Sequence, residues 1–522
     1  MAKLEIRFDE GEVAPAAKPR RGSLLYNTTR RNVFRGMVAA GTLPLFNIGC
    51  AGFGLSRARQ IARGSKIRVA LIGCGMQSNV MIDGALCENL VAVVDPDPAS
   101  RDWLQNHTVA KTCGLEERAN FASARHFSTY QDMFDEMGDE IDAIIVETPN
   151  HQHVLPAVMA MRRGIHVFLD KPLCLTAAEC DLILAEARKH PDLVTQCGTY
   201  GHSFPSMKYC VDRIAEGALG EIREVWAYDD RCNSIYQRPA AAPPPKGMDW
   251  DLWCGGSPMC DYYPGTPDQD GMHPHGWHSW IGYGNGSIGN LGMHIMDVAF
   301  WALGLKDPDT VTCHEAKFAL DGAWAYRDAL EFHYPTSKFG HEVTMHWWDG
   351  LNDGVPYTKE YVNKFGLPYK REHLNIPPKV LEVEKQNGFE RDPFYKNGVL
   401  FVGTRGNLWF THHGGYRFMP RKNGWCIPRV DRPDDFDYRR VTPHHFHEFY
   451  AAIREGREAN DCFEYSVPLA KTVCLGNISA LAGKGSVLQW DGHSVTNNED
   501  ANKYVTRNYR SGWNPFDGWE VA

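Results

Sequence analysis

The chain has 522 residues, which is too long for one ordinary hydrophobic core and predicts two domains with additional segments. Hydrophobic residues make up 43% of the chain and charged residues 23%, a composition that excludes disordered and fibrous proteins and is ordinary for a soluble globular one. The formal net charge is −9 and no basic stripe runs through the body of the chain, which argues against nucleic-acid binding.

The first 50 residues differ from the rest. Residues 11–35 are basic and polar and contain the pair Arg30-Arg31, and a short apolar run, residues 37–46, follows. That run is too short to cross a bilayer, which takes about 20 apolar residues, so we expect no integral membrane span. A paired arginine before such a run resembles the bacterial twin-arginine export signal, with a disordered basic tail as the alternative.

Cys50 stands in a degenerate lipoprotein box, so a free periplasmic protein and a membrane-anchored lipoprotein both remain open. The 15 cysteines are scattered singly, without a Cys-x-x-Cys pair or zinc-like spacing, and most read as small buried residues. Twin-arginine substrates fold in the reducing cytoplasm before they cross the membrane, which is consistent with a protein that needs no disulfides.

From Lys66 onward, β-branched runs alternate with helix-like blocks. A helix is expected over residues 153–163, and Thr176 and Glu179 have the spacing of a capping box at the start of another helix. This alternation predicts a doubly wound parallel sheet, the Rossmann type of α/β fold, over residues 66–190. The expected strands are residues 67–72, 90–95, 141–146 and 165–169.

Beyond residue 196 the pattern changes. Residues 228–290 form long loops rich in Gly, His and Trp, and the strand-like segments that follow come without intervening helices. We therefore expect a second α/β domain over residues 191–467 with a mostly antiparallel open sheet. Its expected strands are residues 224–228, 329–334, 342–347, 399–402 and 407–410. A final helix, about residues 468–482, and a tail to residue 522 are expected to pack back on the body.

A glycine-rich turn follows the first expected strand. Its glycines permit a tight turn and let the backbone approach a pyrophosphate at a helix N-terminus, with Ser78 in place of the third glycine. Asp95 ends the second strand, where a carboxylate accepts a hydrogen bond from a ribose 2′-hydroxyl and disfavours a 2′-phosphate. These features predict NAD, with NADP less favoured and a plain tight turn as the alternative. The expected contacts of the turn are Gly73, Gly75, Met76 and Gln77.

More polar residues follow the third and fourth strands. In an open parallel sheet the carboxyl ends of the strands line the ligand crevice, so these residues are expected at the nicotinamide end of a dinucleotide. Lys171 could hydrogen-bond and polarise a substrate hydroxyl there, whereas a surface lysine in a salt bridge is the alternative. The residues are Thr148, Pro149, Asn150, His153, Asp170 and Lys171.

Together with residues 289–297, these motifs resemble the glucose-fructose oxidoreductase / inositol dehydrogenase / MocA (Gfo/Idh/MocA) family. The resemblance covers about residue 66 to the C-terminus. A secreted bacterial subgroup of the family is resembled in three segments, residues 198–203, 248–253 and 509–513. It implies a Rossmann domain, then an α/β domain whose open sheet often mediates a homodimer or homotetramer. It also places the family's catalytic lysine at Lys171, preceded here by Asp170 instead of the usual Glu.

The resemblance further implies a catalytic carboxylate four residues before a histidine. Asn290 and His294 stand at those positions, with Asp297 one helical turn on. Asn290 can orient a hydroxyl but lacks the negative charge that would help His294 act as a base. Either Asp297 supplies that charge, or the reaction differs from ordinary alcohol oxidation. An asparagine that caps the helix, with a histidine facing the core, is the alternative.

The histidine-rich loop at residues 273–278 has loose spacing and no accompanying cysteine or carboxylate pattern, so we expect no metal site. Contacts with sugar hydroxyls are the preferred interpretation, and packing within the loop is the alternative. The candidate substrate contacts are Tyr200, His202, Arg231, His273, Trp277 and His278.

The sequence thus predicts an NAD-dependent oxidoreductase that acts on a sugar or glycoside. Because an exported enzyme has no pool of free NAD, we expect it to retain its cofactor in a redox-neutral cycle. An NAD-dependent glycoside hydrolase, which works by transient oxidation, elimination and re-reduction, is the alternative that the resemblance allows. A non-catalytic sugar-binding protein with a vestigial cofactor is the alternative of another class, and Asn290 favours it.

Overall fold

The computed structural model describes residues 64–266, 270–353, 370–389, 393–420 and 438–517, together with positions 61 and 355. The predicted export signal and Cys50 lie outside the described residues. Within the described part of the chain, no helix is both long and apolar enough to cross a membrane.

The first sheet has six parallel strands in the order β3-β2-β1-β4-β5-β6. This order confirms the predicted doubly wound sheet, and it places the crevice between β1 and β4, where the order reverses. The strands are β1 (Arg68–Ile72), β2 (Asn89–Val94), β3 (Arg125–Phe127), β4 (Ala143–Val146), β5 (His166–Leu169) and β6 (Thr195–Cys197). The last of them lies beyond the predicted domain boundary at residue 190.

Helices connect these parallel strands. The predicted capping box is confirmed: the Glu179 N–H donates to Thr176 Oγ1, and the Thr176 N–H donates to Glu179 Oε2. The elements are α2 (Ser78–Leu86), α3 (Pro98–Trp103), the π-helical η1 (Leu104–Val109), α4 (Ala110–Thr112), α5 (Leu115–Ser123), α6 (Tyr130–Met137), η2 (Gly138–Glu140), η3 (Asn150–Gln152), α7 (Val154–Arg162) and α8 (Ala177–Lys189).

The second sheet has eight strands in the order β13-β12-β11-β7-β10-β9-β8-β14. Its neighbours pair antiparallel except β7 and β10, which confirms the prediction of a mostly antiparallel open sheet. The strands are β7 (Ile222–Tyr228), β8 (Thr310–Lys317), β9 (Arg327–Tyr334), β10 (Val343–Gly350), β11 (Gly398–Gly403), β12 (Gly406–Phe410), β13 (Tyr416–Pro420) and β14 (Val487–Gln489).

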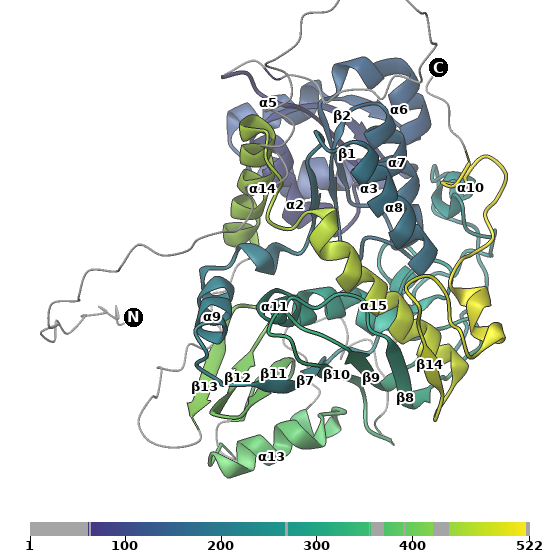
Figure 1. Cartoon of the computed structure of the whole chain (residues 1–522). Helices are drawn as coiled ribbons and strands as arrows, with labels where there is room; N and C mark the ends of the chain where they lie inside the picture. The colour runs from purple at the N-terminus through teal and green to yellow at the C-terminus, as the bar shows by residue number, and fades with distance from the viewer. Residues whose placement is uncertain are drawn as a thin grey trace, which may run out of the picture. The chain divides into compact units, whose positions relative to one another are not determined.

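The helices that follow β6 in the chain are η4 (Tyr200–Ser203), α9 (Pro205–Ala215), α10 (Trp250–Cys254), η5 (Gly276–Ser279), the π-helical η6 (Ile288–Gly292), α11 (Met293–Leu303), η7 (Arg371–His373), α13 (Pro378–Gln386), α14 (Tyr438–Glu455), α15 (Phe463–Ala482) and η8 (Glu499–Tyr504). In Figure 1, α9, α11 and α15 lie on the face of this sheet toward the Rossmann domain, and α13 lies on the other face. The expectation that no helix separates the later strands is wrong for α13, whose signal was Pro378 at its first position.

Two late helices return to the Rossmann domain and join the two sheets in one hydrophobic core. Helix α15 is buried almost throughout and packs on α8 as well as on β8 and β9. Helix α14 packs on α2, where a Cβ at Gly84 would overlap the Phe446 ring and where Tyr450 Oη donates to the Gly84 carbonyl at 3.0 Å. Residues 438–455 therefore cover the Rossmann domain, although the sequence assigned them to the second domain.

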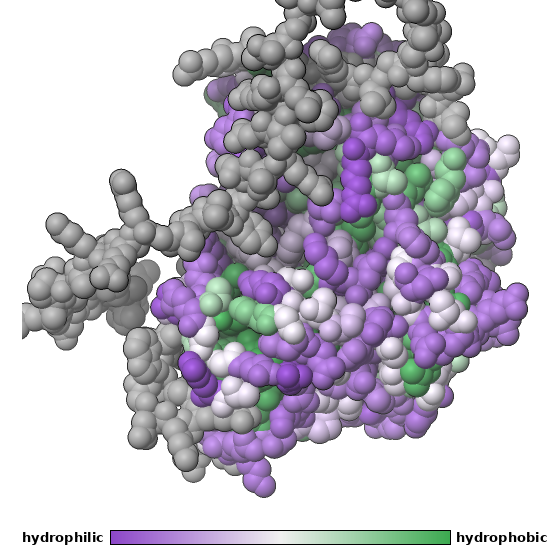
Figure 2. Space-filling model, in the orientation of Figure 1, coloured by the Kyte–Doolittle hydropathy of each residue, from purple (hydrophilic) through white to green (hydrophobic). Residues whose placement is uncertain are grey.

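The face of the molecule in Figure 2 is mostly hydrophilic, with apolar side chains in small separate areas. Large exposed apolar side chains are likewise scattered over the described surface, from Trp103 and Leu115 to Phe339 and Phe516. Scattered apolar side chains of this kind are normal for a protein surface and need no ligand to cover them.

Candidate active site

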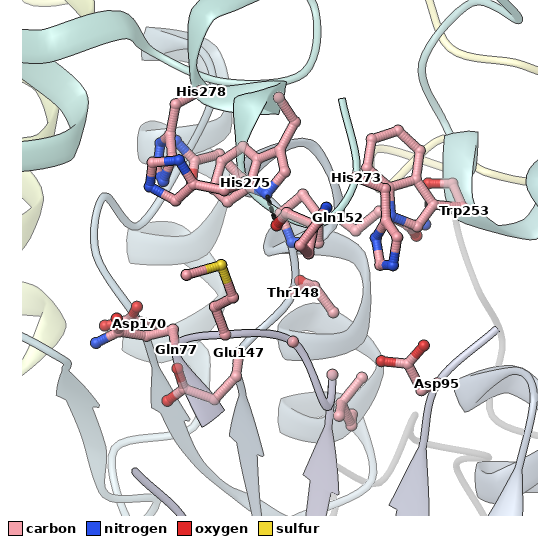
Figure 3. A pocket seen from close by; sticks show the side chains of 18 of the residues that line it. Gln77, Asp95, Glu147, Thr148, Gln152, Asp170, Trp253, His273, His275 and His278 are labelled. Carbon is pink, nitrogen blue, oxygen red and sulfur yellow. Dashed lines mark hydrogen bonds between the residues drawn. The ribbon is translucent and has the colours of Figure 1, made fainter. Parts of the chain in front are cut away.

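A cavity with a volume of about 300 Å³ lies at the carboxyl ends of β1, β2, β4 and β5. Residues directly after these strands form its floor, and the loops around α10, η5 and η6 form its other walls. Figure 3 shows Asp95 at one end of this cavity and Glu147 and Asp170 at the other. The cavity thus occupies the crevice in which open parallel sheets bind their ligands.

The glycine-rich turn borders the cavity through Gly73, Gly75, Met76 and Gln77. Gly73 has a φ of +99°, and a Cβ there would come within 2.6 Å of the Glu147 carbonyl oxygen, so this position requires glycine. Ser78 is buried and donates from Oγ to the Gly73 carbonyl at 2.8 Å, which closes the turn in front of α2. The turn thus leads into the N-terminus of α2, the end of a helix that suits a pyrophosphate.

Asp95 holds the turn against the end of β2. Its Oδ2 accepts from the Cys74 N–H at 2.7 Å and its Oδ1 from the Asp97 N–H at 2.8 Å. Burial raises the pKa of Asp95 to about 6. Because the carboxylate also borders the cavity, its remaining lone pairs can accept from ribose hydroxyls. The residues at this end therefore fit the adenosine half of a dinucleotide.

Lys171 stands at the opposite end, next to Asn290. Its Nζ donates to the Asn290 carbonyl oxygen at 2.9 Å and to Oδ1 of the same residue at 3.4 Å. The Asn290 amide in turn donates to Asn233 Oδ1 at 3.0 Å. Burial lowers the pKa of Lys171. One proton of the ammonium group remains available for a hydroxyl in the cavity, since a lysine carries three donors.

His294 completes this end of the cavity. Burial, followed by the positive charges of Lys171 and Arg231, holds the pKa of His294 well below its usual value, so the imidazole is neutral. Its Nδ1 is buried without a hydrogen-bond partner, and its ring lies 4.6 Å from that of Tyr200. The structure thus brings together Lys171, Asn290 and His294, all predicted from the sequence, around one space.

Asp297 does not line the cavity. Its carboxylate lies 3.1 Å from the His202 ring and accepts from Tyr465 Oη at 2.6 Å, and it is fully buried. Asp297 lies three residues after His294 on α11. The side of the helix that carries it faces η4 and α15 instead of the cavity. Asp297 and His202, which the sequence predicts as a catalytic residue and a substrate contact, therefore lie outside the set of residues that border the cavity.

His153 also lies behind the cavity wall. Its two ring nitrogens are each 2.8 Å from a carbonyl oxygen, one of Thr148 and one of Pro172. The side chain thereby ties the segment after β4 to the segment after β5. Thr148, Pro149, Asn150 and Asp170 do border the cavity, as expected. His153 positions these segments and is not a direct contact of a ligand.

Of the predicted substrate contacts, Tyr200, Arg231, His273, Trp277 and His278 border the cavity. The loop that carries three of them is attached to the Rossmann domain, because His273 Nε2 lies 3.1 Å from Asp97 Oδ2. Over the described residues, no group of three or more His, Cys, Asp or Glu side chains could hold a metal ion.

Glu147 was missed by the sequence analysis. Both of its carboxyl oxygens are buried without a hydrogen-bond partner, and so is Oδ1 of Asp170. Burial, followed by the charge of Asp170, raises the pKa of Glu147 well above its usual value, and burial raises that of Asp170 to about 6. The sequence signal for Glu147 is its position directly after the strand predicted over residues 141–146. The unpartnered oxygens of these two carboxyl groups suit the hydroxyls of a second ribose.

Comparison with known proteins agrees with this geometry. Residues 67–197 match the family model GFO_IDH_MocA, described as an oxidoreductase family with an NAD-binding Rossmann fold. A glycosyl hydrolase family 109 protein of Shewanella pealeana is 30% identical over 164 residues, 30% of this chain and 33% of that protein. A 2,7-anhydro-N-acetylneuraminate hydratase of Mediterraneibacter gnavus is 29% identical over 84 residues, 16% of this chain and 22% of that protein.

The chain therefore matches less than half the length of these curated relatives. Solved structures extend the likeness of fold to both domains. An inositol dehydrogenase homolog from Azotobacter vinelandii, in complex with NAD+, has a TM-score of 0.53 at 17% identity, covering 84% of this chain and 100% of that one. An aldose-aldose oxidoreductase from Caulobacter crescentus has a TM-score of 0.51 at 16% identity, covering 81% and 100%.

The buried carboxyl group of Asp95 predicts a pH-dependent affinity for NAD. Below a pKa of about 6 the carboxyl is protonated and loses acceptor capacity, so the Kd for NAD should rise by up to about tenfold per pH unit. Asp95→Asn should reduce this dependence to the part that Asp170 contributes, and it should weaken binding by about 10-fold at pH 8. Titration calorimetry from pH 5 to 8 measures both.

Asp102→Asn is the matched control, because Asp102 is exposed, pairs with Arg101 and does not border the cavity. It should bind NAD as the unmodified protein does. An affinity for NAD that does not change between pH 5 and 8 in the unmodified protein would remove Asp95 from the site, as would tighter binding of NADP than of NAD.

Proposed function

We propose, from the premise that residues 67–197 form a Rossmann domain of the Gfo/Idh/MocA oxidoreductase family, that this protein is an NAD-dependent enzyme acting on a sugar or glycoside. The observation that carries the proposal is the group of Lys171, Asn290 and His294 at one end of a cavity whose other end holds Asp95. The same cavity therefore holds acid-base groups at one end and, at the other, a carboxylate that can accept hydrogen bonds from a ribose.

Bound in this cavity, NAD would accept a hydride from a carbon of the substrate and later return it. Lys171 hydrogen-bonds the oxygen on that carbon, and its ammonium charge stabilises the oxygen as its proton leaves. His294 is neutral and has a free Nδ1, so it can accept that proton. Asn290 keeps Lys171 aimed at the oxygen through its carbonyl group.

The reaction that we favour is a redox-neutral cycle on one retained cofactor. Coupled oxidation and reduction of two sugars would close such a cycle. So would a glycosidase reaction, in which a transiently oxidised sugar has a more acidic neighbouring C–H bond, loses that proton and its glycosidic leaving group, adds a water across the resulting double bond and is reduced again. The second course needs an additional acid-base group beside Lys171 and His294. Glu147, buried with a raised pKa, is such a group. Likeness to a family 109 glycosyl hydrolase favours the same course.

Export by the twin-arginine route is part of the proposal. Arg30-Arg31 and the short apolar run after them support it. Every cysteine that the structure describes is a free thiol, which suits a protein that folds in a reducing compartment. Replacing Arg30 and Arg31 by lysine should leave the protein in the cytoplasm; unchanged delivery to the periplasm or membrane would contradict export by this route.

The proposal also includes a homodimer or homotetramer that forms through the open sheet. The mass of the protein in solution tests this oligomeric state.

Lys171→Ala should lower turnover on the active sugar or glycoside by a factor on the order of 10²–10⁴, because it removes a positioned acid-base group. Nucleotide content after purification should stay unchanged. Asn290→Asp is a second variant that tests the same contact. A carboxylate beside the Lys171 ammonium group raises the pKa of Lys171, so the pH optimum of turnover should move upward. Near-normal turnover of Lys171→Ala would exclude Lys171 from the chemistry.

Turnover should need no added nucleotide. The dialysed protein, assayed with a panel of glycosides and free sugars, should give sustained product without build-up of NADH. Activity only with added NAD, with NADH accumulating in step with product, would identify an ordinary dehydrogenase. Bound NAD with no turnover, and no change of the nicotinamide absorbance on addition of sugars, would favour the sugar-binding alternative.

A further inference from the structure

The end of the cavity near Asp95 is covered by side chains from outside the Rossmann domain. Trp253 from α10, His273 from the loop before η5 and Trp513 from the C-terminal tail all border the cavity. Figure 3 shows Trp253 and His273 above Asp95. Trp513 packs edge-on against Tyr130, with ring centroids 6.1 Å apart, and Tyr130 begins the helix after β3, the strand next to β2. All three rings therefore stand on the adenosine side.

Trp253 is held firmly in this position. The Gln152 amide donates to the carbonyl oxygens of Leu252 at 2.7 Å and of Trp253 at 2.9 Å. The indole ring of Trp253 lies between two others, stacked on Trp250 at 4.5 Å and on Tyr283 at 5.6 Å. Because Trp250 and Tyr283 cover its faces, the indole presents its edge to the cavity, as a preformed and rigid part of the wall beside a flat ligand.

Trp513 is held by the tail that precedes it, and Arg507 is the main attachment. Its guanidinium donates to Glu179 Oε1 at 2.9 Å, to Ser257 Oγ at 2.8 Å and to the His151 carbonyl at 2.7 Å. One side chain thus joins α8, the segment after α10 and the segment after β4. Tyr509 Oη also donates to Glu179 Oε1, at 2.8 Å.

Closer to Trp513, Arg510 pairs with Asp251 and donates to the Gly255 carbonyl at 3.1 Å. The tail also runs tightly over Gly256, where a Cβ would lie 3.3 Å from the Trp513 carbonyl oxygen and 3.4 Å from its Cβ. Yet the Trp513 side chain remains partly exposed, unlike the rings of Trp253 and Tyr130. Of the three rings that cover this end of the cavity, the ring of Trp513 is the one on the C-terminal tail.

We infer that Trp253, His273 and Trp513 form an aromatic cage for the adenine of a bound dinucleotide, and that the tail at residues 505–517 is the wall that opens for the nucleotide to leave. The inference rests on the proposed function, because it assumes that the dinucleotide binds with its adenosine half at Asp95. It explains how this chain would retain a cofactor: the Rossmann domain supplies the floor, and α10, the histidine loop and the tail enclose the base.

Trp513→Ala tests the cage. Loss of stacking on one base costs on the order of 10- to 100-fold in affinity. ADP-ribose, which has the adenosine half without nicotinamide, should bind more weakly by that factor in calorimetry, and NAD should dissociate correspondingly faster. Binding of nicotinamide mononucleotide, the other half, should be unchanged. Phe339→Ala is the control, since Phe339 is an exposed aromatic residue outside the tail and does not border the cavity.

Arg507→Lys tests the tail without removing a ring. A lysine keeps the charge, but its single ammonium nitrogen cannot reach all three acceptors that the separate nitrogens of the Arg507 guanidinium reach, so NAD should dissociate faster while the affinity for nicotinamide mononucleotide stays unchanged. Equal ADP-ribose affinity and NAD dissociation in Trp513→Ala, Arg507→Lys and the unmodified protein would overturn the cage. If the unmodified protein itself binds neither NAD nor ADP-ribose, the proposed function fails instead.

Discussion

The hydrogen bond from Lys171 to the Asn290 carbonyl joins the two halves of the site. Lys171 follows β5 of the parallel sheet, and Asn290 lies in the π-helical turn before α11, on the other side of the cavity. A buried ammonium group is costly unless it is paired, so this contact holds the two domains at the distance that the cavity requires. His294 reaches the same space because α11 continues that turn. Asn290 and His294 thereby border the same cavity as the residues at the strand ends.

Burial is the second constraint on the site. The pKa values of Asp95 and Asp170 are raised to about 6, that of Glu147 is raised well above its usual value, and those of Lys171 and His294 are lowered. All of these shifts favour the neutral form of the group, and those of the carboxyl groups and Lys171 also bring the pKa nearer to neutral pH. Groups that exchange protons easily at neutral pH are what acid-base chemistry requires, and they gather at functional sites for this reason. The site favours reversible proton transfer over fixed charge, in keeping with a cycle that returns to its starting state.

Much of the parallel sheet could be predicted from the sequence because its strands are continuous apolar runs that end in polar residues. Gly73, Asp95 and Lys171 follow such runs, and the geometry of parallel sheets brings strand ends together. The same rule also covers Glu147, because this residue directly follows the strand predicted over residues 141–146 and precedes Thr148. The short strands β3 and β6, of three residues each, carry too few residues to show a period, so the domain boundary was placed too early.

Other features depend on tertiary contacts that no local pattern shows. Helix α11 is buried on nearly all sides, so the sequence could not tell that Asp297 faces His202 and Tyr465 while His294 faces the cavity. The C-terminal segment at residues 509–513 could be recognised only as a resemblance. Its place beside Tyr130 follows from Arg507, which bonds to three segments distant in the chain.

A crystal structure of the protein loaded with NAD tests the central claim most directly. The account predicts the pyrophosphate on the turn at Gly73 and Gly75, the adenosine ribose on Asp95 and the nicotinamide ring beside Lys171 and His294. The adenine should lie against the ring of Trp513, beside His273 and the edge of Trp253. A nucleotide bound in the reverse direction, or outside this cavity, would contradict the account.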